Sequence, residues 1–234
     1  EVEKALDLEY LDCFGGPDAA HHSFSNLQKA INFSMTSFFT TGGIRGRSKS
    51  INSFEPRSFN MGLSRAAFTA TNGFGQIHPG EDPDLSIRLT KQGFKTKLLP
   101  KAFVYHKRRI SWSKFYTQVY KFGSVRPILN SWHPTTSKIT YWLPTGFLIF
   151  VIVSLVSLEF QFYLPLCFLG FYYILVFVTA FINTKHLGIA FQALFAVNIQ
   201  FMGYGYGFIK STLKLLFSNK TAQELFPNLF FKTL

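Results

Sequence analysis

The most restrictive feature of this sequence is a change in polarity near residue 138. Polar and apolar residues are mixed before that point, whereas three long apolar segments follow it, at 141–158, 160–182 and 187–209. A helix needs roughly 20 apolar residues to cross a bilayer. The first two segments carry no charge and are separated by a link at Glu159, which predicts a helical hairpin. We therefore expect a polar portion followed by membrane helices.

The third apolar segment allows two interpretations, a further span or a helix lying at the membrane interface. Three amide side chains interrupt it: Gln192, Asn198 and Gln200. Three lysines follow it: Lys210, Lys214 and Lys220. If the segment crossed the membrane, these lysines would lie outside, against the positive-inside rule. The sequence predicts two to three spans within residues 139–210, and three is the number we favour from the sequence.

The net charge of +12 is concentrated just before the first apolar segment, because residues 101–138 contain eight Lys or Arg and no Asp or Glu. A basic stretch beside a membrane segment attracts anionic headgroups and stays in the cytoplasm. We expect a multi-pass protein of the cell inner membrane, with a cytoplasmic portion at 1–138 and a short basic and aromatic tail at 211–234. A merely solvated basic face is the alternative. Nucleic-acid binding is disfavoured, and no nucleic-acid partner is expected, because a hydrophobic anchor follows at once.

The turn Gly80-Glu81-Asp82-Pro83-Asp84 is the sharpest candidate for chemistry. Asp82 before Pro83 is typical of a helix N-cap followed by proline at the first helical position. A carboxylate held at such a turn can also accept a proton from a hydroxyl nucleophile. The two interpretations are compatible, because a capped turn holds the carboxylate rigidly. Asp82 and Asp84 are not expected to chelate a metal together, since Pro83 opens a helix and the two side chains diverge.

Two other places could bind a ligand. His106 ends a predicted strand and precedes Lys107, so it could take part in a metal or diphosphate site, although a lone histidine is more often structural. The glycine-rich basic loop at 41–47 could approach a phosphate closely, or it could be a mobile connection.

Several short motifs appear together in a fixed order. They are Phe59-Asn60-Met61-Gly62, Arg65, Gly73-Phe74, Gly80-Glu81-Asp82, Arg88-Leu89 with Gly93, and Val104-Tyr105-His106. Gln118, Gly123 and Arg126 come after them. The order and spacing resemble glycosyltransferase family 2, which has the GT-A fold, across roughly residues 15–126. The fold class expected is therefore α/β, a partial GT-A-like (Rossmann-like) domain followed by transmembrane helices.

The resemblance implies a role for each matching residue. Asp82 would be the general base that deprotonates the acceptor hydroxyl, and Glu81 would support the same turn. His106 would complete the site of a divalent metal, Mg or Mn. The remaining matches would bind substrate: Asn60 and Gly62 at the floor of the donor pocket, and Gln118 and Arg126 against the diphosphate or acceptor.

One departure from the family pattern is serious. The family's first half supplies nucleotide-binding βαβ units and a D-x-D metal motif, and nothing before residue 40 provides them. We therefore expect residues 1–138 to be the C-terminal part of a GT-A domain, and the fragment alone to be inactive.

The function expected is that of an inverting, hexosyltransferase-type enzyme of polysaccharide biosynthesis. It would transfer a sugar from a nucleotide-sugar donor to a hydroxyl of a lipid-linked or polysaccharide acceptor. The alternative is a membrane-anchored basic binding or scaffold protein without catalysis. A transporter is disfavoured, because the apolar segments lack the buried ionisable residues that mark a transport path.

Overall fold

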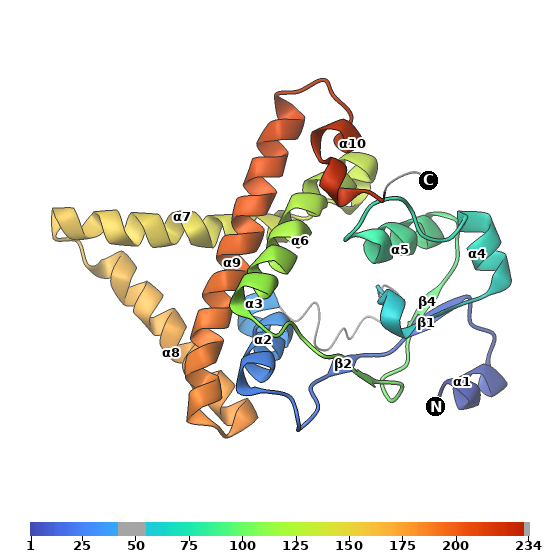
Figure 1. Ribbon diagram of the computed structural model, residues 1–234, viewed down its shortest axis with the longest axis horizontal. Coiled ribbons are helices and arrows are strands. Elements are labelled where there is room, and N and C mark those ends of the chain that lie inside the picture. The colour runs from blue at the N-terminus through green and yellow to red at the C-terminus, as the bar shows by residue number, and fades with distance from the viewer. Residues whose placement is uncertain (42–54, 232–234) are drawn as a thin grey trace.

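The computed structural model describes residues 1–41 and 55–231, so the glycine-rich loop beyond Thr41 lies outside the described residues. Figure 1 shows short strands and small helices on one side and long helices on the other. Three helices are long and apolar enough to cross a membrane: Ile139–Phe160, Leu164–Thr184 and Leu187–Leu216. The prediction of an α/β part followed by candidate membrane helices is therefore confirmed.

A three-stranded sheet in the order β3–β1–β4 lies at the centre of the α/β part. Its strands are β1 (Cys13–Gly15), β3 (Met61–Leu63) and β4 (Thr96–Leu98). β1 pairs antiparallel with β3 and parallel with β4, so that Cys13 lies opposite Leu63 on one side and Thr96 on the other. Helices α4 (Arg65–Thr71) and α5 (Glu81–Lys91) cover this sheet. The small core between them contains Cys13, Ala67, Leu85 and Leu89.

A second pair of strands extends the chain toward the long helices. β2 (Asp18–Ala19) pairs in parallel with β5 (Val104–Tyr105). Helix α1 (Val2–Leu8) precedes β1, and α2 (Asn26–Thr36) and α3 (Phe38–Thr41) follow β2. α2 starts at a capping box in which Ser25 and Gln28 exchange hydrogen bonds, and this fixes the direction in which it leaves β2.

Helices α6 (Trp112–Trp132) and α9 (Leu187–Leu216) run side by side (Figure 1). Glycines on both helices allow the close approach. A Cβ added at Gly123 of α6 would lie 2.0 Å from the carbonyl oxygen of Tyr204, and one added at Gly207 of α9 would lie 2.4 Å from that of Tyr120. Only a residue without a side chain fits at either place.

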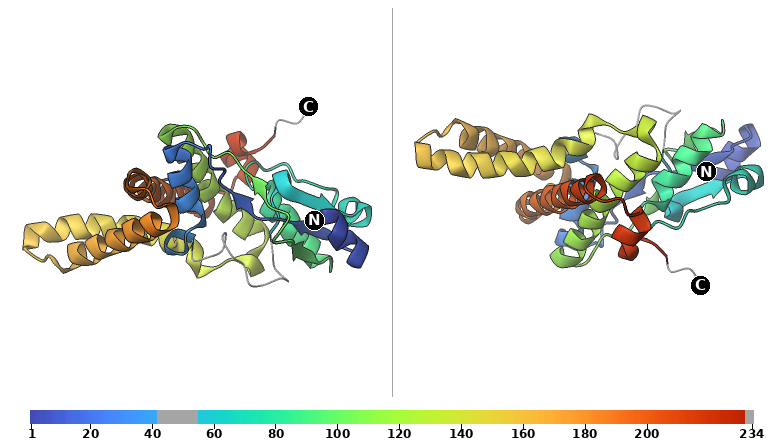
Figure 2. Two further views of the ribbon diagram at one scale, coloured as in Figure 1. Left: turned by 90° about the horizontal axis from the view of Figure 1, so that it is seen from below. Right: turned by 90° about the horizontal axis from the view of Figure 1, so that it is seen from above.

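Helices α7 (Leu143–Val156) and α8 (Leu164–Thr184) form the predicted hairpin, which projects away from the rest of the chain (Figures 1 and 2). Short 3₁₀ turns at Ile139–Trp142 and Ser157–Phe160 extend α7 at both ends. Each helix has a proline in its first turn, where no backbone hydrogen bond is lost.

The last described segment folds back onto the α/β part. α10 (Ala222–Leu225) and a 3₁₀ turn at Pro227–Leu229 lead to a β-bridge between Phe230 and Ile77. The N–H of His78 donates to the carbonyl of Leu229 at 2.8 Å, and that of Phe231 donates to Gln76 at 2.9 Å. The tail predicted at 211–234 thus contacts the loop that leads into α5.

One local prediction is wrong in detail. α5 begins at Glu81 with Gly80 as its N-cap, so Asp82 lies in the first turn and does not cap the helix. Gly80 adopts a φ of +124°, which is open to glycine, and the helix starts two residues earlier than the proline indicated. Directly before β3, the chain forms a 3₁₀ turn, Ser58–Asn60.

Candidate functional site

The start of α5 rests on α6. A Cβ added at Gly80 would lie 2.5 Å from Cγ1 of Val125, so the glycine lets the turn sit directly on α6. Ile77, just before this turn, is fully buried in a cluster with Val125, Ile128 and Leu129. The apolar face of α6 therefore fixes where the first turn of α5 presents its carboxylates.

Asp82 projects from this first turn toward the segment before β3. Its Oδ1 accepts a hydrogen bond from the backbone N–H of Ser58 at 3.0 Å. Burial raises the pKa of the Asp82 carboxyl above its ordinary value, and the neighbouring charge of Glu81 raises it further, while Arg57 and the Ser58 hydrogen bond act in the opposite direction. The result is a half-buried carboxylate with increased basicity, the property a general base requires.

Glu81 precedes Asp82 and has a different environment. Its Oε1 lies 3.1 Å from Nδ1 of His78, and its side chain is 18% exposed. Its Oε2 is buried and has no hydrogen-bond partner within the described residues. A buried carboxylate oxygen without a partner is unusual in a folded protein and suits a site that a ligand hydroxyl completes.

His106 lies on the other side of the same segment. Its ring stacks on Phe59, with 4.0 Å between ring centroids and 24° between planes. Burial and the charges of nearby arginines, Arg57 among them, lower the pKa of His106, so its ring is neutral at neutral pH. Residues 57–59 thus bring together the predicted base and the predicted strand-end histidine, since Ser58 binds Asp82 and Phe59 stacks on His106.

A buried arginine anchors the chain just after β5. Arg108 pairs with Asp18, and its Nε donates to Oδ1 of Asn32 at 3.1 Å. The carbonyl of Arg108 accepts a hydrogen bond from Nε2 of Gln28 at 3.0 Å. Burial lowers the pKa of Arg108, and the attraction of Asp18 opposes that effect. Arg108 therefore serves the structure, whereas Arg109 next to it is exposed to solvent.

A second polar network, which the motifs of the sequence did not predict, lies under α5. Asp84 is 5% exposed; its Oδ2 accepts from Nε of Arg88 at 2.9 Å, and its Oδ1 lies 2.9 Å from Nε2 of His133. Nδ1 of His133 lies 2.9 Å from Nζ of Lys91. Arg88 also donates to the carbonyls of Thr71 and Gly73. Both oxygens of Asp84 are thus engaged in structure, consistent with rejecting a joint Asp82–Asp84 metal site.

Asn60 and Gly62 have structural contacts in this arrangement. Nδ2 of Asn60 donates to the carbonyl of Ala102 at 2.9 Å, which ties β3 to the loop before β5. A Cβ at Gly62 would lie 2.0 Å from the ring of Phe14 on the neighbouring strand. Their predicted place at the floor of a donor pocket stays a prediction.

Gln118 and Arg126 both lie on α6, and neither is among the contacts of Asp82. Gln118 is half-buried. The guanidinium of Arg126 lies over the ring of Tyr141 at 4.4 Å, at the junction between α6 and the hairpin. The substrate-binding roles predicted for these two residues also stay predictions.

The divalent metal implied by the resemblance has no centre within the described residues, which contain no group of three or more His, Cys, Asp or Glu that could hold an ion. His106 is covered on one ring face by Phe59 and has arginines nearby, and the Asp18 carboxylate already pairs with Arg108. The described residues therefore do not fit a metal site by themselves. His106 as a ligand stays a prediction.

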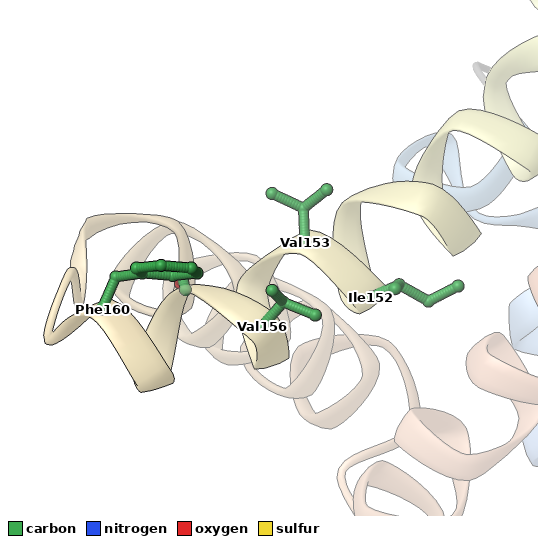
Figure 3. Close-up of a pocket in the computed structure, with 5 residues that line it drawn as sticks. Ile152, Val153, Val156 and Phe160 are labelled. Atoms are coloured by element: carbon green, nitrogen blue, oxygen red, sulfur yellow. The ribbon is translucent and has the colours of Figure 1, made fainter.

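A surface hollow of about 300 Å³ lies far from these residues, on the outside of α7. Ile152, Val153, Val156, Ser157 and Phe160 line it, and Figure 3 shows the labelled side chains spread along the helix, with Ile152 and Val153 pointing in different directions. Because it lies on a candidate membrane helix and is almost wholly apolar, it does not compete with the Asp82 region as a site for a charged donor.

Comparison with known proteins gives one family match. Residues 29–182 match the family model described as Glycosyl transferase family group 2. This range covers more than half of the chain and includes Asp82, Glu81 and His106, together with the hairpin. No sequence among the curated proteins matches the chain.

Proposed function

The chain belongs to glycosyl transferase family group 2, and on that premise we propose that it is an inverting transferase with Asp82 as its general base. The donor would be a nucleotide sugar of the hexosyl type. The acceptor would be a hydroxyl of a lipid-linked or polysaccharide chain at the cytoplasmic face of the membrane. The half-buried Asp82 carboxylate, held by Ser58 and more basic than an ordinary aspartate, is the single observation that carries this proposal.

The reaction uses the two oxygens of Asp82 differently. Oδ1 is hydrogen-bonded to the N–H of Ser58, which fixes the orientation of the carboxylate. We assign Oδ2 to the proton of the acceptor hydroxyl. As that proton moves to Asp82, the acceptor oxygen forms a bond to the anomeric carbon, and the bond from that carbon to the diphosphate breaks on the opposite face. The configuration at the carbon inverts, and the nucleoside diphosphate leaves with the electron pair.

Glu81 would orient the acceptor. Its buried Oε2 can accept a hydrogen bond from a second acceptor hydroxyl, while the contact of Oε1 with His78 keeps the side chain in place. Such positioning places the reacting hydroxyl within reach of Asp82 before the reaction begins. It also explains why a buried oxygen would be left without a partner in the free protein.

The developing charge on the diphosphate would be balanced by arginines around His106. Arg57 influences the pKa of both Asp82 and His106, which shows that its charge acts on both sides of the 57–59 segment. Exposed Arg109 follows the same strand end. Guanidinium groups bind phosphate through paired, charge-assisted hydrogen bonds, and such stabilisation is often a large contribution to catalysis.

Asp82→Asn in the intact protein tests the assignment. The amide keeps the shape and can still accept from Ser58, but it cannot take a proton, so we expect turnover to fall by about 10²–10⁴-fold while donor binding stays within about twofold. Release of nucleoside diphosphate from a panel of nucleotide sugars, in membranes with acceptor lipid, measures turnover. Equilibrium binding of the same donors measures affinity.

The matched control is Asp7→Asn, which makes the same chemical change at an exposed position of α1. It should leave turnover unchanged. Near-normal turnover in Asp82→Asn would reject Asp82 as the base. If the unaltered protein released no diphosphate from any donor and bound none, the scaffold alternative would replace the transferase.

A further inference from the structure

Both ends of α9 pack against the α/β part of the molecule. In its first half, Ile189, Ala193 and Val197 share a buried cluster with Ile31 and Phe33 of α2. Near its last turn, Leu215 packs against the cluster that holds Ile77, Val125 and Leu229. The chain after α9 then returns to hydrogen-bond with His78 in the loop before α5. A helix that crossed a bilayer would have its two ends on opposite sides, whereas these two ends contact one folded unit.

α6 follows α9 closely, so the two must share one relation to the membrane. Trp112 at the start of α6 meets Phe195 with ring centroids 5.1 Å apart, and Tyr120 farther along meets Tyr206 at 5.9 Å. α6 carries Lys114, Lys121 and Arg126 and is not among the helices apolar enough to span. Each cation at the centre of a bilayer disfavours insertion by about 2.5–3.5 kcal/mol. If α9 crossed the bilayer, α6 would have to lie beside it within the bilayer, together with its three cations.

The exposed side chains of α9 nevertheless form an apolar stripe. Seven of them are between 41% and 70% exposed: Leu187, Phe191, Phe195, Met202, Tyr206, Leu213 and Leu216. At 3.6 residues per turn they fall within a sector of about 100°, so they line one side of the helix along its length. Lys214, which is also exposed, lies outside this sector, with its ammonium group 5.5 Å from the ring centre of Phe226.

The first turn of the hairpin packs directly against α9. Oγ1 of Thr145, in the first turn of α7, donates to the carbonyl of Gly205 at 3.0 Å, and a Cβ at Gly205 would lie 2.7 Å from the carbonyl oxygen of Pro144. Figures 1 and 2 show α7 and α8 projecting from one side of the α6–α9 pair, with β1 and α5 on the other side. The start of the hairpin is thus anchored at Gly205, which lies in the sequence between the stripe residues Met202 and Tyr206.

We propose that α9 lies in the plane of the membrane surface, with its apolar stripe in the lipid, and that only α7 and α8 of the described helices cross the bilayer. The lysines at 210, 214 and 220 then stay on the same side as the basic stretch at 101–138, which removes the conflict with the positive-inside rule. A helix with one apolar side and one side packed on a folded domain is suited to the headgroup boundary. This inference does not depend on the transferase assignment.

Depth measurement along the stripe tests the proposal. Spin labels are placed on Phe191→Cys, Met202→Cys or Leu213→Cys of the intact protein, in vesicles of phosphatidylethanolamine and phosphatidylglycerol. Cys167→Ala forms the background, while Cys13 can remain because it is 0% exposed. The outer two labels are 22 residues apart, about 33 Å along a helix. Oxygen and nickel accessibility should give all three labels the same shallow depth.

Two results would overturn the proposal. Labels at 191 and 213 near opposite surfaces, with 202 deepest, would show that α9 spans. Full water accessibility at all three positions would show that the stripe does not contact lipid.

Sidedness gives a second measurement that needs no substitution inside α9. Lys185→Cys and Asn219→Cys flank α9 at exposed positions, and Gln161→Cys lies at the tip of the hairpin. A membrane-impermeant maleimide applied to sealed cells and to inverted vesicles should label residues 185 and 219 from one side, together with Lys4→Cys in α1, and residue 161 from the other. Labelling of 219 from the same side as 161 would refute the in-plane arrangement.

Discussion

The region around the start of α5 and the region where α6 meets α9 are held together by different contacts. Around α5 the strands are only two or three residues long, and side-chain hydrogen bonds such as those of Asp84 and Asn60 connect the segments. Between α6 and α9 the connection is close backbone packing over glycines and a large apolar cluster. The first region should therefore be sensitive to the loss of a polar atom, and the second to the gain of a methyl group.

The largest effect is expected from Asp84→Ala. It leaves Arg88 and His133 without their carboxylate in a buried setting, and removing one partner of a buried ion pair typically destabilises a protein by about 3–5 kcal/mol. Thermal unfolding in detergent should show a clear drop, whereas Asp7→Ala, on the exposed side of α1, should not change it. A drop of under about 1 kcal/mol would mean that polar contacts do not dominate around α5.

Gly123→Leu tests the close packing between α6 and α9. The new Cβ would meet the carbonyl oxygen of Tyr204 at 2.0 Å, so α6 and α9 must separate, and overpacking of this kind destabilises by about 1–3 kcal/mol. Gly170→Leu on α8 is the matched control, because a Cβ there meets nothing within 4 Å. Unfolding temperature and yield of folded protein should fall for the first variant alone. Equal behaviour of the two variants would show that helix separation is tolerated.

Leu229→Ala tests whether the tail helps to position the turn of α5. Leu229 is 6% exposed beside Ile77, and truncating a buried leucine destabilises by about 2 kcal/mol at the low end of the usual range. We expect a local loosening that lowers turnover several-fold with little change in the unfolding temperature of the helical region. Asn228→Ala, at an exposed neighbouring position, is the control. Unchanged turnover in Leu229→Ala would show that the tail does not help to position the turn of α5.

The sequence predicted features that depend on neighbouring residues, such as turns and helix starts. It did not predict side-chain contacts between residues far apart in the chain. Pro83 placed the start of α5 within two residues, and the Gly80–Asp82 turn indicated the candidate base. The contact of Asp82 with Ser58 joins residues 24 positions apart, and the contact of Asp84 with His133 joins residues 49 apart. No periodicity or motif encodes such pairs, because they arise only when the segments fold together.

The lack of information on distant contacts also explains why the sequence allows two interpretations of α9, a membrane span or an interfacial helix. Its composition is that of a span, because hydropathy depends only on which residues are present. What argues against a span is the burial of Ile189 on α2 and of Leu215 near Ile77, and this is tertiary information. Two sequence features point in the same direction: the amides at 192, 198 and 200, which interrupt the apolar segment, and the lysines at 210, 214 and 220, which conflict with a third span.

The smallest expected effect is the shift in pH dependence caused by Arg57→Gln, which tests the electrostatics of the polar region directly. Arg57 lowers the pKa of Asp82, so its removal raises that pKa further. A general base works only when deprotonated, so activity is present above this pKa and is lost as the pH falls through it. The acid limb of kcat/KM should therefore move to higher pH. The rate well above the limb should also fall, because Arg57 is one of the arginines proposed to balance the charge of the diphosphate. Arg57→Lys retains the charge and should leave the limb in place. If the acid limb of Arg57→Gln did not move, or moved to lower pH, Arg57 would not be what lowers the pKa of Asp82.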